Sequence, residues 1–188
     1  MKVKSRAPLR VGLAGGGTDL ETYYSQYGGL ILNCTIDKYA NVEIEENCNN
    51  FTKISMLDMD DFIEIHENNL FYDKKNNFCL AIAVYKYFIE TFNTKYINLD
   101  IKTYVDAPAG SGLGTSSTLV VALVSAFSNF YNIPLGEYEI AEAPETHGER
   151  GRLGIGWAYL NGQFIEPPDP NPPVQQQQLT GTTPSVIA

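Results

Sequence analysis

Two glycine-rich stretches contain the residue types in this sequence that could hold a phosphorylated ligand. The first reads AGGGTDL over residues 14–20, and the second reads DAPAGSGLGTSS over residues 106–117. Glycines let the backbone approach a ligand closely, and the apolar helix-forming run after Thr115 would present free N–H groups and the positive end of a helix dipole. The second stretch therefore predicts a phosphate cradle of backbone amides, with the hydroxyls of Thr115 and Ser116 beside it.

The second stretch matches neither of the two common phosphate-binding motifs. A P-loop requires a lysine before its final Ser or Thr, whereas Gly114 is followed directly by Thr115. A dinucleotide fingerprint requires a third glycine at the position that Thr115 occupies. The alternative interpretation is a glycine-rich turn before a buried helix that Thr115 or Ser116 caps, and the loop alone does not separate the two.

The first stretch places three consecutive glycines before a hydroxyl and a carboxylate, Thr18 and Asp19. An acceptor carboxylate beside flexible amides suits a polyhydroxylated substrate. The alternative is a strand-to-helix turn in which Thr18 or Asp19 is the N-cap, and for this stretch in isolation that alternative is favoured.

Taken together, the two stretches resemble two motifs of the GHMP kinases, the superfamily of galactokinase, homoserine kinase and mevalonate kinase. The first motif, PGRVNLIGEHTDY in galactokinases, aligns with Pro8, Arg10, Val11, Leu13, Gly15, Thr18 and Asp19. The second, PxxxGLGSSAA, aligns with Pro108, Gly112, Leu113, Gly114, Thr115 and Ser116. The resemblance runs from about Arg6 to Ala141, and the AGGGTDL variant is most similar to the heptose kinase branch.

This resemblance implies an ATP-dependent kinase in which the glycine loop wraps the nucleotide phosphates without a lysine. Residues that it assigns to the nucleotide are Pro108, Gly110, Ser111, Gly112, Leu113, Gly114, Thr115 and Ser116, with Mg²⁺ near Thr115 and Ser116. Arg10 matches the arginine that supports phosphoryl transfer, a role that suits a permanently protonated guanidinium. Residues that it assigns to the sugar are Gly16, Gly17, Thr18 and Asp19. The implied reaction is phosphorylation of a sugar phosphate, D-glycero-D-manno-heptose 7-phosphate, at its anomeric hydroxyl.

Hydrophobic periodicity predicts a mixture of strands and helices. Residues 97–105 and 36–46 alternate apolar and polar side chains, and residues 51–57 and 62–67 flank the turn-like DMDD, so these four segments are predicted strands. Residues 78–92 repeat at helical spacing. Because the strands come in clusters, the pattern favours an α+β fold. The resemblance implies the GHMP-kinase N-terminal domain, a ribosomal-protein domain-like two-layer sandwich of a mixed sheet and helices.

The sequence changes character after Ala143. We expect residues 1–143 to form the ATP-binding domain and residues 144–188 to be a divergent Pro/Gln-rich tail, extended or disordered, because six of the ten prolines lie within 166–188. The heptose kinase branch continues with an aspartate-containing motif and a second domain that this sequence does not match. We therefore expect a chain altered by truncation, frameshift or fusion, with its catalytic base unidentified. We expect a poor kinase by itself that exposes an apolar face and self-associates.

Charge and composition restrict the partners. Thirteen basic and 22 acidic residues give a net charge of −9, which argues against nucleic acid and anionic membrane surfaces, so the expected partners are a small sugar phosphate and ATP.

The start lacks the apolar segment of a signal peptide, and we expect a cytoplasmic protein. Lys2, Lys4 and Arg6 would share one strand face, either as a seat for a substrate phosphate or, as we favour, as a solvated edge.

Two other function classes remain open. One is a non-catalytic nucleotide or sugar binder of the same fold, which the unmatched aspartate motif favours. The other is an adaptor that acts through the Pro/Gln tail.

Overall fold

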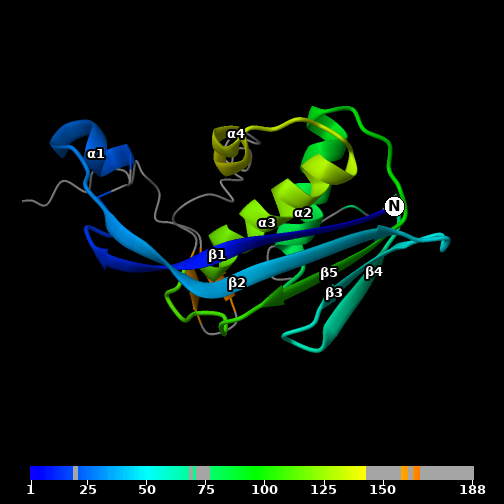
Figure 1. Cartoon of the computed structure of the whole chain (residues 1–188), viewed down its shortest axis with the longest axis horizontal. Helices are drawn as coiled ribbons and strands as arrows, with labels where there is room; N and C mark the ends of the chain where they lie inside the picture. Colours follow the sequence, from blue (N-terminus) through cyan, green and yellow to red (C-terminus); the bar gives the residue numbers. More distant parts are fainter. Residues whose placement is uncertain (19–20, 68–69, 71–76, 143–157, 161–162, 166–188) are drawn as a thin grey trace, which may run out of the picture.

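A five-stranded mixed sheet forms one layer of the molecule (Figure 1). The computed structural model describes residues 1–18, 21–67, 70, 77–142, 158–160 and 163–165. The strands of the sheet are β1 (Lys2–Ala14), β2 (Leu32–Glu46), β3 (Thr52–Met56), β4 (Asp61–Ile65) and β5 (Leu99–Val105). Their order is β1-β2-β5-β3-β4, and all neighbours are antiparallel except β3 and β5, which are parallel. The four predicted strands and the hairpin around DMDD are confirmed.

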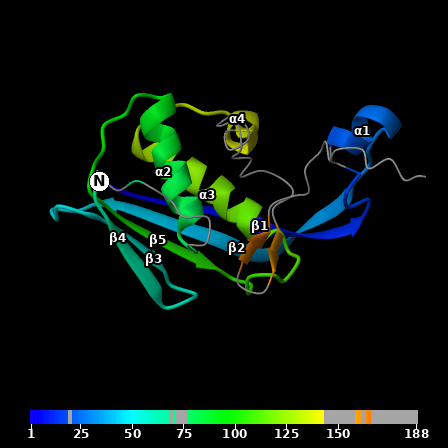
Figure 2. The same ribbon diagram turned by 180° about the vertical axis from the view of Figure 1, so that it is seen from behind.

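Helices form the second layer. They are α2 (Cys79–Thr91), α3 (Thr115–Phe130) and α4 (Glu137–Glu142), whereas α1 (Glu21–Tyr27) lies apart from this layer. Figures 1 and 2 show α2 and α3 lying on the same face of the sheet, and the opposite face carries none of the described helices. The predicted two-layer α+β sandwich and the helix over residues 78–92 are thus confirmed.

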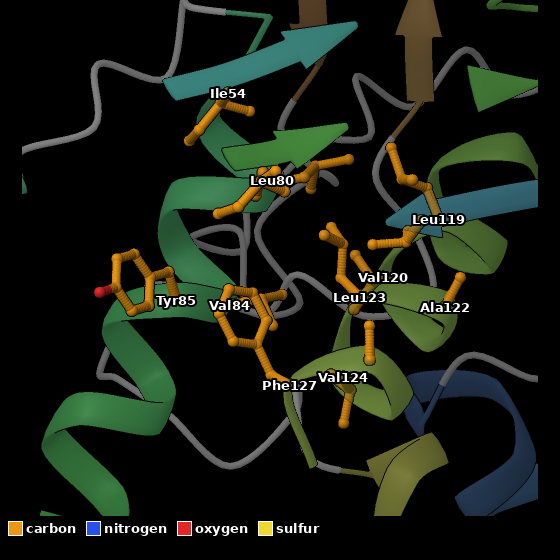
Figure 3. Close-up of a cluster of buried hydrophobic side chains, with 14 of the residues drawn as sticks. Ile54, Leu80, Val84, Tyr85, Leu119, Val120, Ala122, Leu123, Val124 and Phe127 are labelled. Carbon is orange, nitrogen blue, oxygen red and sulfur yellow. The ribbon is translucent and has the colours of Figure 1, made fainter. Parts of the chain in front are cut away.

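The core lies between the sheet and the pair α2 and α3, where Figure 3 shows their side chains meeting. Alternate residues of β2 and β5 point toward the helices and are buried, because successive side chains of a strand point to opposite faces of the sheet. Tyr85 of α2 is fully buried and stacks on Phe127 of α3, with ring centroids 5.2 Å apart. The Tyr85 hydroxyl accepts a hydrogen bond from the Ile97 amide (2.8 Å) and donates to the Ile97 carbonyl. These two hydrogen bonds fix the position of the chain where it enters β5.

β1 and β2 continue past the rest of the sheet as a two-stranded arm with α1 at its tip (Figure 1). Large apolar side chains are exposed on this arm, among them Leu13, Tyr24, Tyr27, Leu30 and Leu32. That they belong to a face that a second domain would cover stays a prediction, as does the expected self-association.

The predicted tail falls mostly on residues outside the described part of the chain. Within it, the structure describes two short antiparallel strands, β6 (Ala158–Leu160) and β7 (Gln163–Ile165). None of the described helices is long and apolar enough to cross a membrane.

Candidate functional site

The second glycine-rich stretch forms the loop between β5 and α3. Gly110, Gly112 and Gly114 have φ values of +78°, +72° and +71°, whereas Ser111 and Leu113 between them have no positive φ. Such an alternation of handedness turns successive backbone N–H groups toward one side, which makes an anion-binding concavity. A Cβ built on Gly112 would meet no atom within 4 Å, so the loop is open at this point. These features are what a backbone phosphate cradle requires.

The start of α3 supplies further donors. Gly114 is the N-cap, and no side chain makes a capping hydrogen bond, so the alternative in which Thr115 or Ser116 caps the helix is wrong. The first amide that bonds back into the helix is that of Thr118, which donates to the Gly114 carbonyl at 3.0 Å. The earlier amides of α3 have no carbonyl of their own helix to bond, and they add to the positive end of its dipole.

Arg10 connects the first motif to this loop. The register of β1 against β2 shifts between Pro8 and Arg10, and beyond the shift the Arg10 amide donates to the Leu113 carbonyl at 3.2 Å. A Cβ built on Gly114 would lie 3.3 Å from Arg10 Nε and 3.4 Å from its Cγ. The half-buried Arg10 side chain therefore packs directly on the glycine loop. The structure brings these two predicted site elements together.

Asp106 fixes the first residue of the loop, and the sequence analysis missed this role. Its Oδ2 accepts a hydrogen bond from the Tyr39 amide at 2.8 Å, and its own amide donates to the Tyr39 carbonyl at 2.9 Å. Tyr39 pairs with Pro8, next to the register shift that precedes Arg10. One aspartate thus aligns β2, the loop and the Arg10 segment. No local signal could reveal it, because its partner lies on another strand.

An apolar pocket that is partly open to solvent adjoins the start of α3. Its walls combine the turn between β3 and β4, the end of β5 and the first turns of α2 and α3. Residues that line it are Met56, Asp58, Met59, Asn77, Leu80, Val105, Ala107, Ala109, Thr115, Ser116 and Leu119. A mostly apolar cavity with a few polar groups is typical of small-ligand sites. Sequence reasoning had placed only Thr115 and Ser116 here.

The first glycine-rich stretch lies farther along β1. Gly15 has a φ of +80°, and a Cβ there would lie 1.9 Å from the Leu30 carbonyl oxygen, so only glycine fits. The Thr18 hydroxyl accepts from the Leu30 amide (3.1 Å) and lies 2.7 Å from the Gly15 carbonyl oxygen. The contacts of this hydroxyl therefore hold the turn. Asp19 lies outside the described residues.

Gly16 and Gly17 leave the same turn accessible, because a Cβ on either would meet no atom within 4 Å. The turn begins five positions after Arg10, which is roughly 16 Å along an extended strand. Sugar binding by Gly16, Gly17, Thr18 and Asp19 stays a prediction.

A magnesium ion would find limited protein ligation here. No group of three or more His, Cys, Asp or Glu side chains suited to a metal occurs in the described ranges. Magnesium at nucleotide sites needs few protein groups, because water and phosphate oxygens fill most of its coordination sphere. The hydroxyls of Thr115 and Ser116 fit an ion of that kind.

Comparison with known proteins gives a consistent result. Residues 79–156 match the family model of the GHMP kinases N terminal domain. The chain is 37% identical over 153 residues to a D-glycero-alpha-D-manno-heptose 7-phosphate kinase of Campylobacter jejuni, which covers 81% of this chain and 44% of that protein. It is 30% identical over 170 residues to a galactokinase of Thermosipho africanus, over 86% of this chain and 42% of that protein.

A solved structure agrees with the sequence matches. The crystal structure of a D-glycero-D-manno-heptose 1-phosphate kinase from Bacteroides thetaiotaomicron superimposes with a TM-score of 0.69 at 36% identity, over 86% of this chain and 54% of that one. The chain spans about half the length of these relatives. The chain belongs to the GHMP kinase superfamily and contains its N-terminal domain.

Proposed function

We propose that this chain binds ATP with Mg²⁺ and serves phosphoryl transfer to a sugar phosphate. The observation that carries the proposal is the packing of Arg10 on the glycine loop. A cradle of amides alone would suit any anion, whereas an arginine placed on it suits the charge that develops on a transferred phosphoryl group.

The loop and the apolar pocket suggest how ATP lies. The phosphates would rest on the amides of residues 110–116 other than Ser111, whose amide already donates to the Pro108 carbonyl at 3.2 Å; positive-φ glycines and the start of α3 present the donors. The purine would enter the neighbouring pocket between Met56, Leu80 and Leu119. When bound, Mg²⁺ would neutralise charge on the phosphate oxygens, with Thr115 and Ser116 as its nearest hydroxyls.

In the reaction, a bond forms between the acceptor hydroxyl oxygen and the γ-phosphorus while the bond from that phosphorus to the β,γ-bridging oxygen breaks. ADP leaves with that electron pair, and the hydroxyl proton passes to a base. Arg10 would donate hydrogen bonds from its planar guanidinium to the transferred group. Glu142, Glu145 and Glu149 are the candidate bases, and the structure describes none of their side chains.

For the acceptor we propose a heptose phosphate, and more narrowly D-glycero-D-manno-heptose 7-phosphate at its anomeric hydroxyl. A heptose phosphate is supported by both the Campylobacter and the Bacteroides relatives, which are named heptose phosphate kinases and are 37% and 36% identical to this chain. The 7-phosphate is supported by the Campylobacter relative alone, because the Bacteroides protein is named a 1-phosphate kinase. The residues proposed for the sugar are Gly16, Gly17, Thr18 and Asp19, the accessible turn at the end of β1 and the carboxylate that follows it.

A coupled binding and turnover experiment tests the proposal. ADP affinity is measured by calorimetry, and turnover of ATP, Mg²⁺ and heptose 7-phosphate is followed by ³¹P NMR, for the wild type and for Arg10→Gln. We expect slow turnover in the wild type, because its base is unidentified, and we expect the variant to lose that turnover while ADP affinity changes only a few-fold. Nucleotide binding without turnover in the wild type would identify the non-catalytic binder instead. Absence of nucleotide binding would contradict the proposal and leave the adaptor alternative, whose tail lies mostly outside the described residues.

A further inference from the structure

A second pocket lies on the face of the sheet opposite α2 and α3. It is a hollow open to solvent and is lined by side chains of β1, β2 and β5 together with Leu57. Four of its lining residues carry charge: Lys4, Arg6 and Lys102 are cationic, and Glu43 is anionic. The lining therefore carries a surplus of positive charge in a chain whose net charge is −9.

Glu43 gathers lysines from two neighbouring strands. Its carboxylate oxygens lie 2.7 Å from Lys2 Nζ, 3.0 Å from Lys4 Nζ and 3.6 Å from Lys102 Nζ. Hydrogen bonds from Lys2 and Lys4 lower the pKa of the Glu43 carboxyl to about 2. Lys2 Nζ also donates to Glu45 Oε2 at 3.2 Å, so Glu43, with Glu45 beside it, holds three ammonium groups at one place against their mutual repulsion.

These cations keep hydrogen-bonding capacity for a ligand. Each ammonium group has three donors, and the Lys4 and Lys102 side chains are 72% and 44% exposed. The Arg6 guanidinium carbon lies 4.7 Å above the centroid of the Tyr39 ring, which holds the side chain over the same face. Its fork of donors is suited to phosphate oxygens.

Apolar surface adjoins this charge. Leu57 is 57% exposed and Tyr104 is 44% exposed, and both line the pocket. An anion with an organic body would cover them while its charge meets the lysines. A dianion interacts about twice as strongly with these cations as a monoanion at the same distance. We propose that this pocket is a second ligand site, which binds the phosphate monoester of a small organic molecule through Lys4, Arg6 and Lys102.

The proposed site is separate from the nucleotide site. Met56 and Val105 line the nucleotide pocket, whereas Leu57 and Tyr104, their neighbours in sequence, line the open-face pocket. The Leu57 amide donates to the Thr103 carbonyl at 2.9 Å, so the β3–β4 turn and β5 form one wall between the two pockets. A substitution that changes one pocket can therefore leave the lining of the other pocket unchanged.

Phenyl phosphate is the probe, titrated into the wild-type chain at physiological salt with ¹H–¹⁵N NMR as the readout. We expect saturable shifts at the amides of Leu57 and Tyr104. In Lys4→Gln/Lys102→Gln the affinity should fall by roughly tenfold or more, since two charged donors are lost. Lys86→Gln is the matched control, because it removes a lysine that lies 3.5 Å from Glu90 on α2, and it should bind as the wild type does.

A Gly112→Ala variant separates this site from the glycine loop, because it should leave the open-face affinity unchanged. Shifts confined to residues 110–116, or an affinity that the double lysine variant does not change, would overturn the proposal. So would absence of saturation at millimolar phenyl phosphate, which would show that the lysines and Glu43 form a structural ion-pair network only.

Discussion

Replacing Gly112 by alanine separates the cradle from the rest of the fold. Gly112 has a φ of +72°, and a Cβ on it would meet no protein atom within 4 Å. The folded chain therefore pays only for the left-handed conformation, about 1–2 kcal/mol, which the reduced entropy of the unfolded chain offsets by about 0.4–1 kcal/mol. The free energy of unfolding should fall by roughly 1 kcal/mol.

Nucleotide affinity should fall much more. The new methyl group lies on the open side of the loop, where the phosphates would sit on the amides. Loss of one hydrogen bond to a charged oxygen costs about 1.5–3 kcal/mol, which corresponds to roughly a tenfold to hundredfold rise in the Kd for ADP.

Calorimetry with ADP and urea denaturation measure the two effects on one sample. Gly28→Ala is the matched control, because its φ of +73° and the empty space around an added Cβ equal those of Gly112, and it lies after α1. It should lose the same stability and none of the ADP affinity. Equal ADP affinity in Gly112→Ala and the wild type would refute the assignment of the phosphates to this loop.

Three further predictions follow from single contacts. Asp106→Ala removes the acceptor of the Tyr39 amide and should lower the free energy of unfolding by about 1–3 kcal/mol and weaken ADP binding, as urea denaturation and calorimetry would show; unchanged ADP affinity would make Asp106 structural only. Thr103→Val should stabilise the chain by about 1 kcal/mol in urea denaturation, because the buried Thr103 hydroxyl has no hydrogen-bond partner among the described residues; a loss of stability would contradict this. Ionised Glu43 stabilises the fold above its ordinary pKa of 4.5, and this contribution is lost as pH falls toward about 2. In urea titrations the stability gap between the wild type and Glu43→Gln should close over that range, and a pH-independent gap would exclude the ion pairs as its source.

Local pattern predicted the elements of this fold well. Apolar residues recur at every second position in residues 97–105 and at every third or fourth position in residues 78–92. These are the spacings at which a strand and a helix bury one face, so the two segments were predictable as a strand and a helix. The start of α3 at Thr115 was predictable from the glycines before it. Its N-cap was not, because Gly114 at positive φ occupies the position that a hydroxyl side chain would otherwise take.

Long-range pairing was not predictable from the sequence. The parallel pairing of β3 with β5 brings Met56 and Met59 beside the start of α3, and nothing in the hairpin sequence indicates that neighbour. The contact between Asp106 and Tyr39 depends on the same strand order. The place of Arg10 came from the family resemblance, and the register shift after Pro8 gives its physical basis.

The central claim is that nucleotide phosphates rest on the glycine loop under Arg10. A ¹H–¹⁵N NMR titration of the chain with ADP and Mg²⁺ tests it most directly, because it reports every amide of the loop and the Arg10 Nε group at once. We predict that the largest shifts occur at the amides of residues 110–116 and at Arg10 Nε. Saturable ADP binding that leaves those signals unmoved would contradict the claim.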